Sequence, residues 1–325
     1  MPGPFPSPTD LTLCFAHVAY QMESTFARRN TGIEHFQVWS RADLAERLPE
    51  ADVLVVSGFW QNSLLEKATK LRFIQSIGAG VDQFDQAALG ARGIRLANAS
   101  GVNRNAVSEH AIACILALAR QLHSGRDNQR GHVWRGMISD LSQREDELGG
   151  KTLLIVGLGA IGSRLAKLAK AFDMRVIATK RNPSTVTGVA DEVHTPDRLL
   201  NLLPQADFVA LTCPLTPETT NLINDTAFDV MKPSAYLINM ARGRCVDEPA
   251  LLTALQDGTI AGAAIDHFWD EPLPGDSPFW DMENVLITPH TAGETRMYEE
   301  NVIDILLENL ARLGEGRETL RNQVV

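Results

Sequence analysis

Short hydrophobic runs alternate with segments of helical periodicity along the first hundred residues. The runs predict five strands, at residues 11–16, 35–39, 53–56, 73–77 and 95–97. Two intervening segments, 41–48 with Ser40 as N-cap and 62–69, have the spacing of helices. Strands that alternate with helices are typical of a parallel sheet, so we expect a small doubly wound α/β domain.

A second series of hydrophobic runs begins at residue 152. It predicts strands at 152–156, 175–179, 207–212, 235–240, 262–266 and 285–288, and helices at 163–172, 248–256 and 295–313, the last of which we expect to return to the first domain. A helix at 105–121 is apolar nearly all round, which predicts burial between domains or subunits. Residues 122–150 look irregular, and a subunit-contact arm is one interpretation. A chain of 325 residues usually divides into two domains.

A glycine-rich turn joins the strand at 152–156 to the helix that follows it. Gly157 permits a tight turn, Gly159 lets the backbone approach a pyrophosphate, and Gly162 lets the helix pack closely on the strand. A diphosphate can then bind at the helix N-terminus. Because a second strand follows as a βαβ unit requires, we interpret the turn as a dinucleotide site rather than a plain glycine turn.

The end of the strand at 175–179 bears on the choice of dinucleotide. An acid that binds the ribose of NAD is usual there, but this chain has Lys180 and Arg181. A Lys-Arg pair neutralises a 2′-phosphate, to which Thr179 or Asn182 could add a hydrogen bond. We therefore favour NADP(H), with NAD(H) possible; the alternative is that both cations belong to a solvated loop.

Composition and charge exclude several classes of protein. The net charge of −10 argues against binding to nucleic acid or anionic membranes. The four cysteines include no C-x-x-C pair, so we predict neither disulfides nor a metal site and expect a cytoplasmic location. The first residues lack the pattern of a signal peptide, and no apolar stretch is long enough for a membrane span.

Polar segments follow three strands of the second series, and they contain Arg242, Glu271 and His290. Strand ends are where doubly wound folds build their sites. A guanidinium, a carboxylate and an imidazole suit hydride transfer to a 2-keto acid: Arg binds the carboxylate and polarises the ketone, His delivers the proton, and Glu keeps His charged. Taken singly, Arg242 could belong to a surface ion pair, Glu271 could be a solvated loop acid and His290 could be a core histidine. Their joint occurrence in this order along the chain favours the catalytic site.

These motifs resemble the D-isomer-specific 2-hydroxyacid dehydrogenase family over residues 71–313. The resemblance is carried by segments 78–82, 107–110, 157–162, 241–243, 266–272 and 289–293. It implies flavodoxin-like and Rossmann-like domains around a cleft: a substrate domain of residues 1–101 plus 291–325, a dinucleotide-binding domain of residues 102–290, and a homodimer.

The resemblance also implies roles for individual residues. Arg242 matches the substrate-binding arginine, Glu271 the partner of the histidine, and His290 the general acid/base. Ala79 and Gly80 match backbone donors to the substrate carboxylate, and Asp266 matches a contact to the nicotinamide carboxamide. The predicted cofactor-binding residues are Gly157, Gly159, Ala160, Ile161, Gly162, Thr179, Lys180, Arg181, Cys213, Pro214, Met240, Asp266 and Gly293.

Three functions remain open from the sequence: an NADP(H)-preferring reductase of glyoxylate, hydroxypyruvate or a similar 2-keto acid, a dinucleotide-sensing binding protein, and a phosphite-type dehydrogenase. Glu271 argues against a formate dehydrogenase, because the formate dehydrogenases of this family have glutamine as the partner of the histidine. Three residues depart from the family pattern. Lys180 stands where an acid is usual, His267 stands where an apolar residue is common, and Trp269 is unusually large. His267 and Trp269 could line the substrate pocket. We expect His110 to be a core or interface histidine and Cys213 and Cys245 to be packed thiols.

Overall fold

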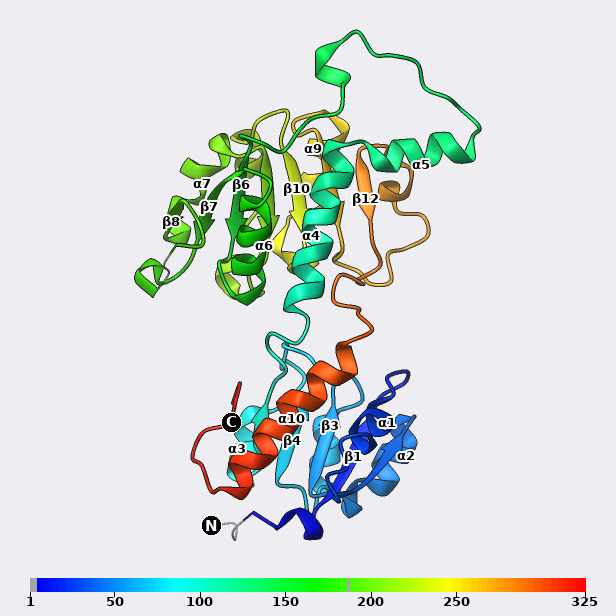
Figure 1. Ribbon diagram of the computed structural model, residues 1–325, viewed down its shortest axis with the longest axis vertical. Coiled ribbons are helices and arrows are strands. Elements are labelled where there is room, and N and C mark those ends of the chain that lie inside the picture. The colour runs from blue at the N-terminus through cyan, green and yellow to red at the C-terminus, as the bar shows by residue number, and fades with distance from the viewer. Residues whose placement is uncertain (1–4, 186–187) are drawn as a thin grey trace. The chain divides into compact units, whose positions relative to one another are not determined.

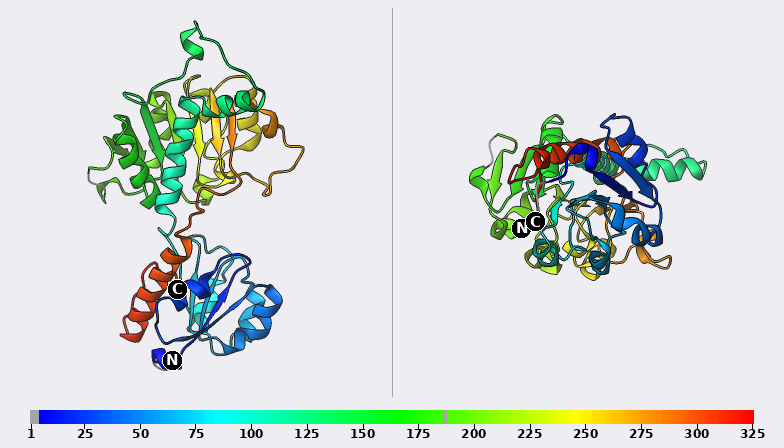
Figure 2. Two further views of the ribbon diagram at one scale, coloured as in Figure 1. Left: turned by 45° about the vertical axis from the view of Figure 1, so that its right-hand side comes forward. Right: turned by 90° about the horizontal axis from the view of Figure 1, so that it is seen from below.

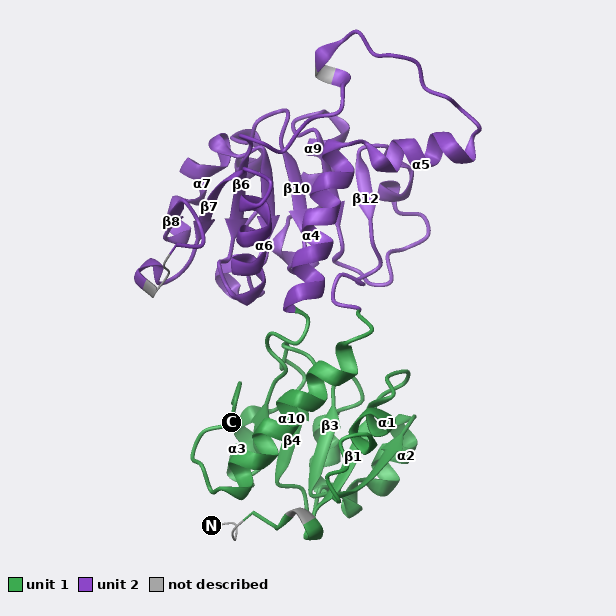
Figure 3. Ribbon diagram, in the orientation of Figure 1, with its two compact units in different colours: residues 1–103, 295–325 green, residues 104–294 purple. Residues whose placement is uncertain are grey.

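The computed structural model describes residues 5–185 and 188–325, and the chain divides into two compact units. Unit 1 comprises the chain up to Asn103 and from Thr295 onward, and unit 2 runs from Arg104 to Glu294 (Figure 3). Both units contain an all-parallel sheet, so the predicted class of two parallel-sheet α/β domains is confirmed.

Unit 1 is built on a five-stranded sheet in the order β2-β1-β3-β4-β5. Its strands are β1 (Thr12–Ala16), β2 (Glu34–Val38), β3 (Val53–Val56), β4 (Phe73–Ser76) and β5 (Arg95–Ala97). Its helices are α1 (Met22–Ala27), α2 (Arg41–Arg47), α3 (Gln86–Ala91) and α10 (Tyr298–Gly314). One face is covered by α1 and α10, and the other by α2 and α3 (Figure 1). Ser40 caps α2 as predicted, because its hydroxyl accepts from the backbone N–H of Asp43.

Unit 2 is built on a seven-stranded sheet in the order β12-β11-β10-β9-β6-β7-β8. Its strands are β6 (Thr152–Val156), β7 (Arg175–Thr179), β8 (Glu192–His194), β9 (Phe208–Leu211), β10 (Tyr236–Asn239), β11 (Gly262–Ile265) and β12 (Val285–Ile287). Its helices are α4 (Arg104–Ala119), α5 (Leu122–Arg130), α6 (Ala160–Lys170), α7 (Leu199–Leu202), α8 (Asp225–Asp229) and α9 (Glu248–Gln256). One face is covered by α4 and α6, which lie side by side, and the other by α7, α8 and α9.

Three local predictions were wrong or incomplete. The segment 62–69 is a 3-10 helix, Asn62–Lys67, in which Leu64 is the buried residue. The segment 122–150 contains α5, which has no buried residue and so lacks the apolar stripe that would have revealed it. The short strand β8 was missed because it is only half-buried at the edge of the sheet and has polar ends.

The segment between α5 and β6 loops out from the rest of unit 2 (Figure 2). Four of its large apolar side chains are exposed, namely Val133, Trp134, Met137 and Leu141, and those of Trp134 and Met137 are almost fully accessible. Exposed apolar side chains that gather on one segment commonly mark an interaction surface. No helix in the described ranges is long and apolar enough to cross a membrane.

Candidate functional site

The glycine loop between β6 and α6 has the close backbone packing that the sequence predicts. Gly157 has a φ of +102°, and a Cβ there would lie 2.7 Å from the backbone of Cys213. A Cβ on Gly162 would lie 2.6 Å from the carbonyl oxygen of Gly157. Gly159, by contrast, faces open space at the start of the eleven-residue α6. The loop therefore fits a dinucleotide, because a diphosphate can approach the free N–H groups of the helix.

The segment after β7 presents two cations beside this loop. The carbonyl oxygen of Thr179 accepts from the N–H groups of Gly157 and Leu158, at 3.2 and 2.9 Å, which ties the end of β7 to the glycine loop. The Thr179 side chain is buried, whereas Lys180 is half-buried and Arg181 exposed. Neither cation forms an ion pair with any residue that the structure describes. Lys180 is thus available to an anion, whereas the charge of Arg181 also acts on Glu218 and helps to lower the pKa of that carboxyl group.

The remaining predicted cofactor residues follow neighbouring strands. Ala160 and Ile161 form the first turn of α6; Cys213 and Pro214 follow β9, and Met240 follows β10. Gly293 belongs to the loop after β12. A hydrogen bond with Cys245 and burial raise the pKa of Cys213, which agrees with a packed thiol.

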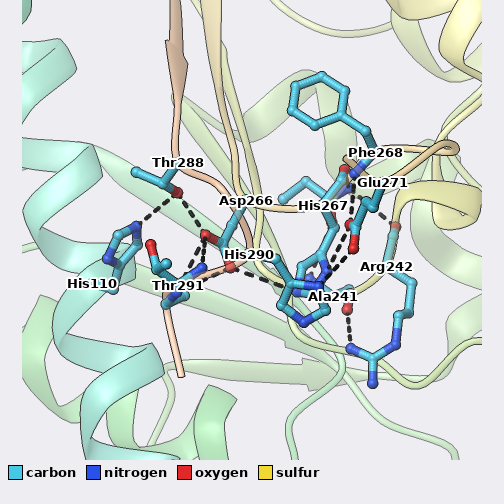
Figure 4. A network of polar contacts seen from close by, with 12 residues as sticks. His110, Ala241, Arg242, Asp266, His267, Phe268, Glu271, Thr288, His290 and Thr291 are labelled. Carbon is cyan, nitrogen blue, oxygen red and sulfur yellow. Dashed lines mark hydrogen bonds and ion pairs between the residues drawn. The ribbon is translucent and has the colours of Figure 1, made fainter. Parts of the chain in front are cut away.

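Asp266 organises the loop that follows β12 (Figure 4). Its carboxylate is 1% exposed and accepts from the Thr288 hydroxyl at 2.6 Å, the Thr291 N–H at 2.9 Å and the Ala292 N–H at 3.1 Å. His110, from α4, lies 3.1 Å from the same hydroxyl through Nε2. His110 is therefore part of the network behind the site, a connection that its sequence context did not reveal.

His290 and Glu271 form a close pair. Nδ1 of His290 lies 2.7 Å from Oε2 of Glu271, and Oε1 of Glu271 accepts from the backbone N–H of Phe268 at 3.1 Å. Burial favours a higher pKa for Glu271, but the hydrogen bond and charge of His290 outweigh it and lower that pKa. His290 has a φ of +55°, and its N–H is held by the carbonyl of Asp266 at 3.0 Å. The pair is fixed in position but accessible, with exposed side-chain fractions of 53% and 36%.

Arg242 projects from the turn that follows β10. The Asn239 side chain fixes this turn, since its amide donates to the Arg242 carbonyl and its oxygen accepts from the Ala241 N–H. The guanidinium is exposed and donates to the Ala241 carbonyl at 2.7 Å. A Cβ on Gly243 would overlap the carbonyl of Phe268, so this turn and the one after β11 are in direct contact. The structure thereby brings Arg242, Glu271 and His290 to one edge of the sheet.

His267 lies directly beside the His290–Glu271 pair. Its side chain is 6% exposed, and its ring meets that of His290 edge-on, with centroids 4.0 Å apart. Nδ1 makes no hydrogen bond although it lies 3.5 Å from Oε1 of Glu271. Burial, and then the positive charges of His290 and Arg242, lower the pKa of His267 to about 4.

Trp269 is fixed in place by two hydrogen bonds. Its indole N–H donates to the Val246 carbonyl at 2.8 Å, and its backbone N–H donates to Glu248 at 2.9 Å. In unit 1, Ala79 and Gly80 follow β4, and the Ala79 carbonyl accepts from the Asn98 amide at 2.9 Å. The Ala79 residue is exposed and its loop is thus available to a ligand.

Comparison with known proteins decides the family. The profile of the D-isomer specific 2-hydroxyacid dehydrogenase NAD binding domain matches residues 112–292. The chain belongs to this family. Among related D-2-hydroxyacid dehydrogenase-type sequences, a glyoxylate reductase of Pyrococcus furiosus is 36% identical over 293 residues, which cover 88% of this chain and 86% of that protein.

Other comparisons agree on the family and its fold. A D-3-phosphoglycerate dehydrogenase of Methanocaldococcus jannaschii is 35% identical over 85% of this chain, but this chain spans only 52% of that protein. The crystal structure of a family member from Aeromonas salmonicida is 31% identical, with a TM-score of 0.83, and the match covers 97% of this chain and 99% of that one. The family predicted from the motifs is confirmed.

Proposed function

We propose that this family member is an NADP(H)-preferring reductase of a small 2-keto acid, such as glyoxylate or hydroxypyruvate, which forms the D-2-hydroxy acid and catalyses the reverse oxidation. The observation that carries the proposal is the 2.7 Å contact between His290 and Glu271 at the same sheet edge as the exposed guanidinium of Arg242. The similarity to glyoxylate reductases supports the substrate class.

Each of the three side chains has one task in this mechanism. When bound, the nicotinamide supplies the hydride that attacks the keto carbon. Nε2 of His290 donates the proton to the keto oxygen, while Glu271 accepts from Nδ1 and stabilises the protonated ring. Arg242 binds the substrate carboxylate and stabilises the charge that develops on the keto oxygen. The N–H groups of Ala79 and Gly80 are proposed as further donors to the carboxylate.

The preference for NADP(H) rests on Lys180 and Arg181. Both follow β7, where an acid would otherwise select the free ribose hydroxyl of NAD. Neither cation forms an ion pair within the described chain, although the charge of Arg181 helps to lower the pKa of Glu218. Lys180 can therefore interact with a 2′-phosphate without leaving a carboxylate, while Arg181 lies near one. Asp266 stays a proposed contact to the nicotinamide carboxamide, and its two oxygens also hold the loop of His290.

We also propose a homodimer that uses the segment between α5 and β6. Trp134, Met137 and Leu141 are exposed there, and burial against a second copy would remove this apolar surface from water. Analytical ultracentrifugation of the wild type and of Trp134→Glu would test this. We expect the wild type to be a dimer and Trp134→Glu to contain a larger fraction of monomer. A monomeric wild type would refute it.

The test of the function is a set of initial rates with NADPH and with NADH on glyoxylate, hydroxypyruvate, pyruvate and phenylpyruvate. We expect turnover with a preference for NADPH, and a loss of about 10²–10⁴-fold in kcat for His290→Ala with NADPH binding retained. Dinucleotide binding without turnover on any keto acid would favour a sensor, and phosphite-dependent reduction of NADP would favour the phosphite-type enzyme.

A further inference from the structure

We infer that His267, Glu271 and His290 form a binding site for a divalent transition metal ion, with Zn²⁺ as the preferred ion, and that its occupation switches the enzyme off. One ligand atom of each side chain lies within 4.8 Å of the ligand atoms of the other two. Figure 4 shows the two imidazoles and the carboxylate converging from the loops after β11 and β12.

His267 adds a third potential metal ligand to the pair formed by Glu271 and His290. Its side chain is 94% buried, yet Nδ1 has no hydrogen-bond partner. Buried polar atoms in folded proteins are nearly always paired, so an unpaired ring nitrogen needs an explanation. Its nearest carboxylate oxygen, Oε1 of Glu271, is 3.5 Å away, which leaves the nitrogen directed at the cluster without bonding to it. A cation between the two groups would satisfy both.

The chemistry and the spacing of the cluster suit Zn²⁺. Two imidazoles and one carboxylate are a ligand set that zinc accepts, with water in the fourth position. Zinc–ligand distances of about 2.0–2.1 Å in a tetrahedral site put the ligand atoms about 3.3 Å apart. Nδ1 of His290 lies 2.7 Å from Oε2 of Glu271, Nδ1 of His267 lies 3.5 Å from Oε1, and one ligand atom of each side chain lies within 4.8 Å of the other two. Side-chain rotations can therefore bring all three groups onto one ion. Mg²⁺ and Ca²⁺ prefer oxygen ligands and are poor candidates.

An ion can reach this cluster from solvent, because His290 and Glu271 are partly exposed while only His267 is enclosed. Binding through Nδ1 of His290 would replace its hydrogen bond to Glu271, and binding through Nε2 would occupy the nitrogen that donates the proton. Binding through Nε2 removes the proton needed at the keto oxygen. Binding through Nδ1 leaves the Nε2–H but prevents the protonated imidazolium, so the ring becomes a much weaker acid. This inhibitory consequence rests on the proposed function, whereas the binding itself does not.

The experiment measures metal binding directly on the untagged, full-length protein. Isothermal titration with ZnCl₂ gives the Kd, and Co²⁺ gives a visible d–d absorption whose intensity reports tetrahedral or five-coordinate binding. The test variant is His267→Gln. The matched control is His194→Gln, because Nε2 of His194 also contacts a carboxylate, that of Glu192, at 3.0 Å, but without a second imidazole. Circular dichroism verifies that both variants are folded.

We expect the wild type to bind one Zn²⁺ that His267→Gln weakens at least tenfold, with loss of the Co²⁺ absorption, while His194→Gln leaves both unchanged. Equal affinity in His267→Gln and the wild type would overturn the inference, as would a wild type that binds no Zn²⁺ at micromolar concentration. Should His267→Gln not fold, His290→Ala replaces it, because that side chain is half exposed.

Inhibition is a separate readout. If the wild type turns over keto acids, the Zn²⁺ concentration that halves its rate should match the measured Kd. In His267→Gln, the Zn²⁺ concentration that halves the uninhibited rate of that variant should be at least tenfold higher. Turnover that persists at saturating Zn²⁺ would overturn the switch. A wild type without turnover would refute the proposed function alone, and the titration would still decide the metal site.

Discussion

Asp266→Asn is the change that best tests how the site is held together, because it alters charge without altering shape. We expect it to lower the free energy of unfolding of unit 2 by about 2–3 kcal/mol. The buried carboxylate accepts from the hydroxyl of Thr288 and from the N–H groups of Thr291 and Ala292. These bonds place His290, which lies between two of the three donors.

The magnitude follows from the three donors. A hydrogen bond to a charged acceptor contributes about 1.5–3 kcal/mol, against about 0.5–1.5 kcal/mol for a neutral one. Asparagine retains one oxygen, which can keep the bonds to Thr288 and Thr291 in weaker, neutral form. Its NH₂ group would then face the N–H of Ala292, which the second oxygen of Asp266 now accepts at 3.1 Å. The Ala292 N–H also lies 3.2 Å from the retained oxygen, so it too can keep a weaker, neutral bond. A loss of about 1 kcal/mol at each of the three donors gives about 3 kcal/mol, the upper end of the stated range.

The assay is urea unfolding followed by tryptophan fluorescence, together with hydrogen–deuterium exchange of residues 288–292, which reports this loop alone. Asp270→Asn is the matched control: it is four residues from Asp266, exposed, and forms no hydrogen bond or ion pair with any described residue. We expect faster exchange at 288–292 and lower turnover in Asp266→Asn only. An Asp266→Asn protein with the stability and exchange of the control would refute the reasoning.

Three further changes test other parts of the molecule. Lys180→Asp should lower kcat/KM for NADPH at least about tenfold but leave kcat/KM for NADH unchanged, because it replaces an attraction to the 2′-phosphate with a repulsion. An unchanged ratio of kcat/KM for NADPH to kcat/KM for NADH in steady-state kinetics would contradict the phosphate role. Gly243→Ala should destabilise the protein by about 1–3 kcal/mol in urea unfolding, because its Cβ overlaps a backbone carbonyl, whereas Gly275→Ala, in open space, should stay within about 0.5 kcal/mol. Burial raises the pKa of Cys14 and of Cys114 to about 12, so iodoacetamide at pH 8 should label them only after unfolding; labelling in the native protein, detected by mass spectrometry, would show that these thiols are accessible.

The strands were predictable because burial on both faces leaves an unbroken apolar run. Every predicted strand lies within one residue of its observed bounds, from β1 to β12, and among the strands of the described residues only β8 was missed. That strand pairs on one side only and keeps Glu192 and His194 half-exposed, so it carries no apolar run. The helix α5 escaped prediction for the same reason, since none of its residues is buried.

The gathering of Arg242, Glu271 and His290 was predictable for a topological reason. They follow β10, β11 and β12, which are consecutive in the chain and adjacent in the sheet. All three strands are parallel and in direct register, so their carboxyl ends meet at one edge. Order along the chain therefore becomes proximity in space, and three residues that are unremarkable one at a time converge.

The second layer of the site was not predictable, because it depends on how loop side chains turn after the strands end. From the sequence, His267 is only an unusual residue after an aspartate, and His110 is one polar position on an apolar helix. In the structure, His110 reaches Thr288 and thereby Asp266, while His267 turns its ring against His290 and an unpaired nitrogen toward Glu271. An apolar residue at 267 would leave Glu271 with His290 as its one imidazole neighbour. The histidine instead gives that carboxylate two, and this is why one substitution at position 267 can separate metal binding from the proton chemistry of His290.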